Sequence, residues 1–318
     1  MDLIASTKIL VTGATGFVGT NFLRLMTGRG LNPATPTRKD YDLLEQSEVR
    51  AMLADLKPEL VIHLAGLVGG ILGNKERPAD YHYQNALMGE MLMHESCRAG
   101  VEKYVTVMGG CSYPAHAPNP IKETSLFYGY PQELTAPYSI AKAMNAVQAA
   151  AYREQYGFNA VVLVPGNMYG PHDNFDLQRS HVIPALIRRY FEAKKSSAPE
   201  VIAWGSGKPI RDFVYVCDVC EALLLAAQNY DGAELINVSS GKPITVKALT
   251  EKIAGIVGYS GTVRWDTTKP DAQMEKLFDV SRLKSLLGYE CPTSLDEGLK
   301  KTYEWFAQNY DTARLNAD

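Results

Sequence analysis

Tyr138 and Lys142, which are four residues apart, form the pair in this sequence that is best suited to acid–base chemistry. On a helix this spacing places both side chains on one face, about one turn apart. An ammonium group in that position stabilises a phenolate and lowers the tyrosine pKa from its ordinary value of about 10. Such a tyrosine can give a proton to a carbonyl oxygen, or take one from an alcohol, while hydride moves elsewhere. The alternative is a surface helix pair without a function, and the rest of the chain decides between the two.

A glycine-rich loop near the N-terminus predicts a dinucleotide-binding site. The apolar run 8–12 is typical of a buried parallel strand, a loop follows it at once, and residues 20–27 are typical of a helix. In this order the glycines allow a tight turn and close approach to a pyrophosphate, whose charge the helix N-terminus favours. The loop residues that we expect to bind the cofactor are Gly13, Thr15, Gly16, Phe17, Val18 and Gly19.

The residues that follow this loop indicate which dinucleotide binds. About 20 residues further on, an NAD-binding fold places an acid against the ribose 2′-hydroxyl. This chain has Arg38 and Lys39 there, and a guanidinium suits a 2′-phosphate, so the sequence favours NADP(H). Solvated charges after a strand are the alternative. Residues 60–66 predict another apolar strand, and its small-residue end, Leu64, Ala65 and Gly66, is expected to lie beneath the cofactor.

The elements that position these residues predict an α/β protein with a doubly wound parallel sheet, the Rossmann arrangement. The β–α alternation is regular to about Val164 and loosens afterwards. We expect an NADP-binding domain at 1–170, to which a segment near 212–240 returns, and a smaller α/β substrate domain in 171–318. Further expected helices are 42–56, 79–99, 138–156, 180–195, 218–228 and those starting at 246 and 295; further expected strands are 103–108, 159–164, 201–205, 210–216, 234–238 and one near 263.

The composition is that of an ordinary soluble globular protein. The chain has 318 residues, of which 46% are hydrophobic and 21% charged. A net charge of −3 gives no basic field for nucleic acid, and no apolar run approaches the roughly 20 residues that span a bilayer. Five scattered cysteines and an N-terminus unlike a signal peptide indicate a cytoplasmic enzyme, and no cysteine spacing predicts a metal site.

Longer segments resemble the extended short-chain dehydrogenase/reductase superfamily and, within it, the GDP-L-fucose synthases, which epimerise and reduce GDP-4-keto-6-deoxy-mannose. The likeness extends over nearly the whole chain, and the segments Tyr-Gly-Pro-His-Asp-Asn-Phe and Ser-His-Val-Ile-Pro-Ala are highly specific. The segments that carry it are 13–19, 68–71, 111–114, 137–142, 167–175, 180–189, 204–213 and 278–283.

The resemblance implies a role for each of four catalytic residues. Tyr138 would protonate the C4 oxygen as hydride arrives, while Lys142 lowers its pKa and holds the nicotinamide ribose. Cys111 and His181 occupy the positions of the epimerisation acid/base pair. A hydrogen next to a keto group is acidified because its anion is an enolate, so a base and an acid on opposite faces can invert the centre. Taken without the resemblance, Cys111 reads as a small buried residue and His181 as a polar residue at a helix start.

The resemblance also implies binding contacts and an assembly. Arg189 and Arg211 would grip the nucleotide diphosphate, because guanidinium is planar, always charged and able to bind phosphate through two donors. Surface ion pairs are the alternative for both. Trp204 would pack in the nucleotide pocket, and the family often forms homodimers through long helices. The other implied contacts are Val68, Gly69, Gly70 and Asn167 for the substrate, and Lys142, Pro165, Asn167, Met168 and His181 for the cofactor.

Two positions depart from the family pattern, and both lie in the expected sugar pocket. The family has a serine, four residues before the tyrosine of Cys-x-Tyr-Pro, that donates a hydrogen bond to the sugar carbonyl; here that position is Gly109. Loss of such a donor typically costs on the order of 10²–10³ in rate. Ser112 or a water could substitute. Leu67 stands where the family usually has lysine.

Three hypotheses follow from this pattern. The first is a 3,5-epimerase and NADPH-dependent 4-reductase that acts on a GDP-4-keto-6-deoxyhexose or a related GDP-sugar. The second is a GDP-keto-sugar epimerase without net reduction, which Gly109 favours. The third is a nucleotide-sugar or NADP-sensing protein without turnover.

Overall fold

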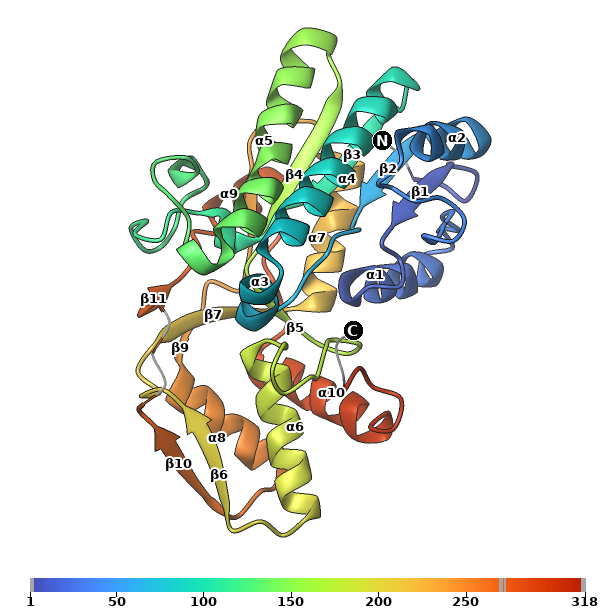
Figure 1. The fold of residues 1–318 in the computed structure, drawn as a ribbon. Helices are drawn as coiled ribbons and strands as arrows, with labels where there is room; N and C mark the ends of the chain where they lie inside the picture. The colour runs from blue at the N-terminus through green and yellow to red at the C-terminus, as the bar shows by residue number, and fades with distance from the viewer. Residues whose placement is uncertain (1–2, 269–270, 272, 316–318) are drawn as a thin grey trace.

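A five-stranded parallel sheet forms the upper half of the molecule in Figure 1. The computed structural model describes residues 3–268, 271 and 273–315. The strand order is β1-β2-β3-β4-β8, and Ala34 adds a single parallel bridge beside Leu10 of β1. This arrangement confirms the predicted doubly wound parallel sheet. The strands are β1 (Ile9–Thr12), β2 (Leu60–His63), β3 (Lys103–Val107), β4 (Asn159–Pro165) and β8 (Ile236–Val238).

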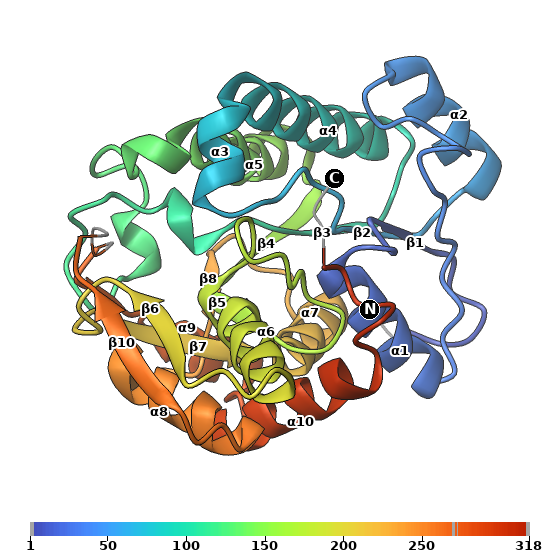
Figure 2. The same cartoon turned by 60° about the horizontal axis from the view of Figure 1, so that its bottom comes forward.

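Helices cover both faces of this sheet, as its continuously buried apolar strands require. Phe22 of α1 (Phe17–Gly28) and Leu223 of α7 (Val216–Asn229) share one buried core with β1. A second core on the other face is lined by three helices that lie side by side in Figures 1 and 2. These are α2 (Gln46–Leu56), α4 (Pro78–Arg98) and α5 (Ala136–Tyr156).

The lower half of the molecule contains the later helices and two small sheets (Figure 2). α6 (Val182–Lys195), α8 (Val246–Val257) and α10 (Leu295–Gln308) enclose a third apolar core. The first small sheet has the order β11-β7-β5, with β9 antiparallel to β7, and the second pairs β6 with β10. Their bounds are β5 (Asn167–Tyr169), β6 (Glu200–Trp204), β7 (Ile210–Tyr215), β9 (Pro243–Thr245), β10 (Thr262–Asp266) and β11 (Glu275–Lys276).

The two strands expected around the turn at 207–209 form, but they do not pair with each other. β6 pairs in parallel with β10, while β7 pairs with β5, β9 and β11. Gly205 and Gly207 both have positive φ, so the chain turns away between the strands instead of closing a hairpin. Trp204 and Arg211 are thereby carried on separate sheets.

Two short helices, α3 (Ile71–Glu76) and α9 (Ser281–Leu287), were not expected from the sequence. The helix expected from position 42 begins instead at Gln46, because the Asp42 carboxylate accepts the Leu44 N–H and closes a turn. Within the described residues, no helix is long and apolar enough to cross a membrane.

Candidate active site

The glycine loop lies directly on the carboxyl end of β2. Gly13 has φ +72°, and a Cβ there would lie 2.4 Å from the Ala65 nitrogen and 2.5 Å from the Leu64 carbonyl carbon. A Cβ at Gly19 would lie 2.1 Å from the Gly13 oxygen. Since no side chain caps the N-terminus of α1 at Gly16, its first N–H groups remain available to an anion. This cradle fits a dinucleotide pyrophosphate.

The other residues expected at the cofactor lie beside this loop, at the ends of neighbouring strands. Arg38 follows the bridge at Ala34; its side chain is 71% exposed and paired with Asp42, with Nη2 and Oδ2 2.9 Å apart. Pro165 ends β4, and Asn167 and Met168 begin β5. The Asn167 amide donates to the Asp212 carbonyl at 2.8 Å, which fixes its orientation.

Tyr138 and Lys142 lie one turn apart near the start of α5, as their spacing predicts. Lys142 is buried, and burial lowers its pKa to about 8. The expected sign for Tyr138 is wrong in this structure: its pKa is raised, first by desolvation and then by Cys111 and Tyr81. The withdrawal of water and the two neighbouring acidic groups all disfavour the phenolate. Tyr138 therefore holds its proton firmly and is an acid rather than a phenolate here.

Gly109 marks the point at which the expected acid groups meet. Its missing Cβ would lie 3.0 Å from the Cys111 Sγ and 3.7 Å from the Tyr138 Oη. The thiol and the phenol come from different elements, the 3₁₀ turn Gly110–Ser112 and α5, so the fold brings them together. Ser112 does not replace the hydroxyl donor that is missing at Gly109. It is buried, and its Oγ donates to the Ser139 carbonyl at 2.9 Å.

His181 and Lys276 add two basic groups to this site. His181 is the N-cap residue of α6 and has a large accessible area, yet its surroundings desolvate it enough to lower its pKa. The positive charge of Lys276 acts in the same direction. Lys276 lines a small cavity together with Cys111, and its own pKa is lowered by burial. Sequence reasoning missed Lys276, since a lone lysine in a short strand makes no pattern; only its place just before segment 278–283 could have indicated it.

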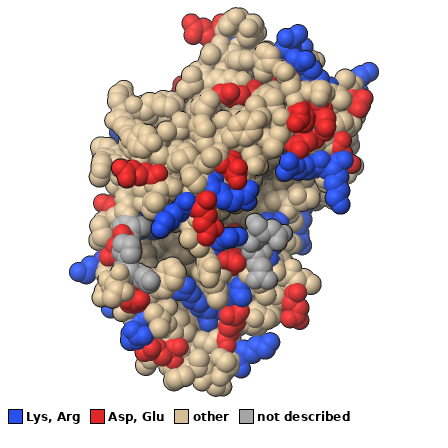
Figure 3. All heavy atoms as spheres, viewed as in Figure 1, with Lys and Arg blue, Asp and Glu red and all other residues tan. Residues whose placement is uncertain are grey.

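The residues expected at the nucleotide diphosphate lie in the lower half of the molecule. The Arg189 guanidinium carbon is 4.9 Å from the centre of the Trp204 ring, a cation–π distance, and Trp204 is 55% exposed. Arg211 of β7 is in register with Lys276 of β11. Burial lowers the pKa of both arginines, although a guanidinium stays charged. Figure 3 shows Lys and Arg side chains gathered around a hollow across the middle of this face.

The loop 68–70, expected at the sugar, is held by backbone contacts. The Gly70 N–H donates to the Arg179 carbonyl at 2.9 Å, and Gly69 packs against the hydroxyl of Tyr81. Leu67, just before this loop, exchanges two hydrogen bonds with the Asn85 amide through its own backbone. These bonds use only the backbone of Leu67. Its apolar side chain cannot make the polar contact that the usual lysine of the family could make.

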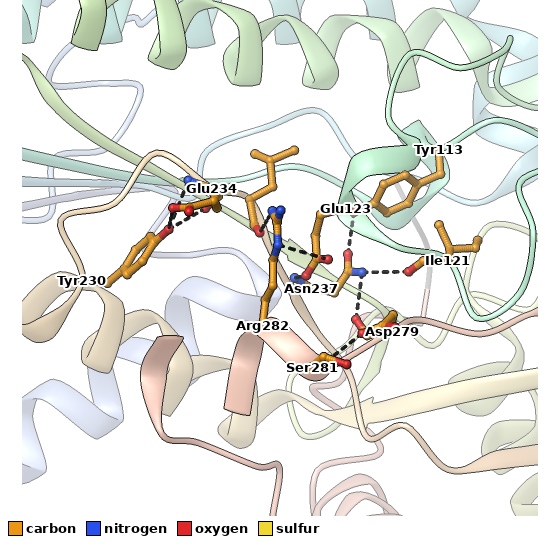
Figure 4. Close-up of polar contacts among 10 residues, drawn as sticks. Tyr113, Ile121, Glu123, Tyr230, Glu234, Asn237, Asp279, Ser281 and Arg282 are labelled. Atoms are coloured by element: carbon orange, nitrogen blue, oxygen red, sulfur yellow. Dashed lines mark hydrogen bonds and ion pairs between the residues drawn. The ribbon is translucent and has the colours of Figure 1, made fainter. Parts of the chain in front are cut away.

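A buried asparagine anchors the loop that carries Cys111 (Figure 4). The Tyr113 hydroxyl donates to the Asn237 Oδ1 at 2.5 Å, and the Asn237 amide donates to the carbonyls of Ile121 and Asp279, each at 3.0 Å. The Asn237 N–H donates to the Glu123 carboxylate at 2.8 Å. Because these groups are satisfied and buried, the network holds the 109–113 loop rigidly on β8. No cluster of His, Cys, Asp or Glu among the described residues could hold a metal ion.

The family of the protein follows from comparison with known proteins. Residues 9–239 match the model of the NAD dependent epimerase/dehydratase family. This match covers the glycine loop, Gly109, Tyr138 and the whole five-stranded sheet. The chain therefore belongs to the NAD dependent epimerase/dehydratase family.

Within this family the similarity is to GDP-L-fucose synthases, which confirms the resemblance seen in the sequence. The putative GDP-L-fucose synthase 2 of Arabidopsis thaliana is 41% identical over 96% of this chain and 93% of the relative. The structure of a GDP-L-fucose synthetase from Naegleria fowleri bound to NADP has a TM-score of 0.90 and 27% identity, and covers 99% of this chain and 98% of that one. A GDP-6-OMe-4-keto-L-xylo-heptose reductase from C. jejuni also has a TM-score of 0.90, at 30% identity, and covers 97% and 100%.

Proposed function

We propose that the protein is an NADP(H)-dependent epimerase/reductase of a GDP-4-keto-6-deoxyhexose or a related GDP-sugar. The observation that carries this proposal is the meeting of Cys111 and Tyr138 at Gly109, a thiol and a phenol within reach of one small ligand. Relatives named as GDP-sugar synthases and reductases support the same activity. They do not favour an epimerase without net reduction.

The cofactor is held by the cradle that lies on β2. The N-terminus of α1 and the Gly13–Gly19 backbone bind the pyrophosphate, and Arg38 binds the 2′-phosphate, which selects NADP over NAD. Leu64, Ala65 and Gly66 pass beneath the dinucleotide, with Pro165 and Met168 beside it. When bound, NADPH supplies the hydride for C4 of the sugar.

The protein's own side chains move the protons. Cys111 and His181 remove and return the acidic hydrogens next to the keto group, one from each face of the sugar, which inverts C3 and C5. Tyr138 then donates its proton to the C4 oxygen. Burial raises the pKa of Tyr138, so its hydroxyl carries the proton before this step. Lys142 holds the nicotinamide ribose and offers a charge one turn away.

The GDP part of the substrate is bound in the lower half of the molecule. Arg189 and Arg211 bind the diphosphate, and Trp204 packs against the nucleoside. The loop 68–70 and Asn167 contact the sugar. Both arginines are partly desolvated, and the charge of an incoming diphosphate compensates for that loss of water.

The proposal extends to organisation and location. Residues 1–170, together with a returning segment near 212–240, act as the cofactor domain, while 171–318 mainly bind substrate. The placement of β8 beside β4 supports this division. We also propose a homodimer formed through the long helices α4 and α5, on which Tyr83 and Val147 are exposed, and a cytoplasmic location.

One incubation tests the catalytic assignment. The enzyme is mixed with GDP-4-keto-6-deoxy-mannose and NADPH in heavy water, and NADPH oxidation is followed together with product mass and NMR. We expect stoichiometric oxidation and deuterium at C3 and C5. Tyr138→Phe should reduce oxidation by about 10²–10⁴-fold, the usual value of a general acid, while deuterium still enters. Cys111→Ala should abolish the exchange. Undiminished oxidation in Tyr138→Phe, or none in the wild type, contradicts the proposal.

A further inference from the structure

Tyr81, in the first turns of α4, carries a hydroxyl that makes no hydrogen bond to the described residues. The side chain is only 6% exposed. No hydrogen bond joins its Oη to any residue that the structure describes, although the hydroxyl is a good donor and acceptor. The hydroxyl oxygen is not among the fully buried side-chain atoms that lack a partner, so water or a ligand can reach it and accept its hydrogen bond.

The ring of Tyr81 lies beside that of Tyr138, the proposed general acid. It meets the ring of Tyr138 edge to face, with centroids 6.4 Å apart at an angle of 73°. The two tyrosines come from neighbouring helices, α4 and α5, which pack along their length. They are close enough that the charge state of Tyr81 raises the pKa of Tyr138.

The hydroxyl itself lies beneath the loop proposed to hold the sugar. A Cβ at Gly69 would lie 2.2 Å from the Tyr81 Oη, and one at Gly73 would lie 2.7 Å from it. Two glycines thus leave room for this one oxygen, and Gly69 belongs to the 68–70 loop. Burial also raises the pKa of Tyr81, so the group is a neutral donor over the physiological pH range.

The position of Gly109, beside Tyr138, lacks a donor. Gly109 has no side chain, and the hydroxyl of Ser112 in the same loop donates to the Ser139 carbonyl. The pocket therefore has an empty donor position and, beside Tyr138, an unpartnered hydroxyl.

From this we infer that Tyr81 is a further catalytic residue, whose hydroxyl donates a hydrogen bond to the keto oxygen of the sugar beside Tyr138. The inference rests on the proposed function. Tyr138 transfers its proton to that oxygen, whereas Tyr81 keeps its own and stabilises the developing negative charge. No bond to Tyr81 forms or breaks.

Tyr81→Phe tests the inference, because it keeps the ring that packs on Tyr138 and removes only the oxygen. We expect kcat for keto-sugar-dependent NADPH oxidation to fall by about 10²–10³-fold, as for the loss of an oxyanion donor, with an unchanged Kd for NADPH. The matched control is Tyr128→Phe, whose side chain is 87% exposed; its kcat should equal that of the wild type.

A second variant separates a chemical role from a structural one. Gly109→Ser supplies a new hydroxyl at the empty donor position, whose backbone, with φ −76° and ψ 143°, accepts any residue. In the Tyr81→Phe background it should restore kcat at least about tenfold, whereas in the wild type it should change kcat less than about threefold, since residues that share a function are not additive.

The inference is overturned if Tyr81→Phe keeps kcat within about threefold of the wild type. It is also overturned if Gly109→Ser raises kcat equally in both backgrounds. A wild-type enzyme that oxidises no NADPH with any GDP-keto-sugar contradicts the proposed function instead, so the two failures are distinguishable.

Discussion

Two glycines in different regions of this molecule differ in whether the backbone requires them. In the cofactor cradle, a Cβ at Gly13 would overlap the backbone of Leu64 and Ala65, and its φ is +72°. In the sugar pocket, Gly109 has an extended backbone, and the nearest atom to its missing Cβ is the Cys111 Sγ at 3.0 Å. The backbone enforces the first glycine. The second occupies a position that a side chain could fill.

This difference teaches how each region can change. In our proposal the cradle recognises the dinucleotide through main-chain N–H groups, so its sequence is tied to the shape of its backbone. The proposed sugar pocket recognises its ligand through side chains, and a donor lost at one position can be supplied from another. Gly109 and Tyr81 are such a pair in our proposal.

The largest expected effect comes from Gly13→Ala. A methyl group 2.4 Å from backbone atoms, at positive φ, must displace the loop, at a cost on the order of 3 kcal/mol. If NADPH binding must restore the displaced loop, the NADPH Kd rises about 100-fold. Fluorescence titration with NADPH measures it, and Gly28→Ala, with nothing within 4 Å of its Cβ, is the control. An unchanged Kd in Gly13→Ala would contradict the claim that the backbone requires a glycine in the cradle.

A smaller effect is expected from pH, through the lysine shared by the two regions. Burial lowers the pKa of Lys142 to about 8 in the free enzyme. Its ammonium is charged below that pH and neutral above it, so kcat/KM for NADPH should fall about tenfold between pH 7 and pH 9. Lys142→Arg keeps its charge throughout and should flatten this limb at a lower overall rate. A flat profile in the wild type would show that the charge of Lys142 is not needed.

The sequence predicted the cradle and the sheet well because both rest on local patterns. An apolar run, a glycine loop and a helix in direct succession have one common solution, and the structure has the expected sheet. Tyr138 and Lys142 were predicted by their helical spacing in the same way. The pairing of β6 with β10 could not be predicted, because it joins strands that are distant in the chain and depends on the turns at Gly205 and Gly207.

Two side chains near the proposed sugar site escaped prediction for a related reason. Lys276 and Tyr81 approach Cys111 and Tyr138 only through packing of separate elements, and neither stands in a motif. The hydrogen bond from the Ser112 hydroxyl to the Ser139 carbonyl likewise depends on where the folded chain directs that side chain. The sign of the Tyr138 pKa shift also depends on burial, which spacing alone does not give.

The smallest effect is expected from Gly109→Ala, which makes the same chemical change as Gly13→Ala in the other region. Here the backbone needs no rearrangement, and a thiol at the end of a short side chain must give way by a few tenths of an ångström. Loss of unfolded-state freedom stabilises by roughly 0.4–1 kcal/mol, which offsets that contact. We expect the denaturation midpoint and the NADPH Kd to match the wild type, with kcat within about twofold, because a methyl group adds no donor. Chemical denaturation and NADPH titration of the two alanine variants, measured side by side, decide the matter. Equal damage at both positions would mean that Gly109 is also held by the backbone, and the contrast between the two regions would disappear.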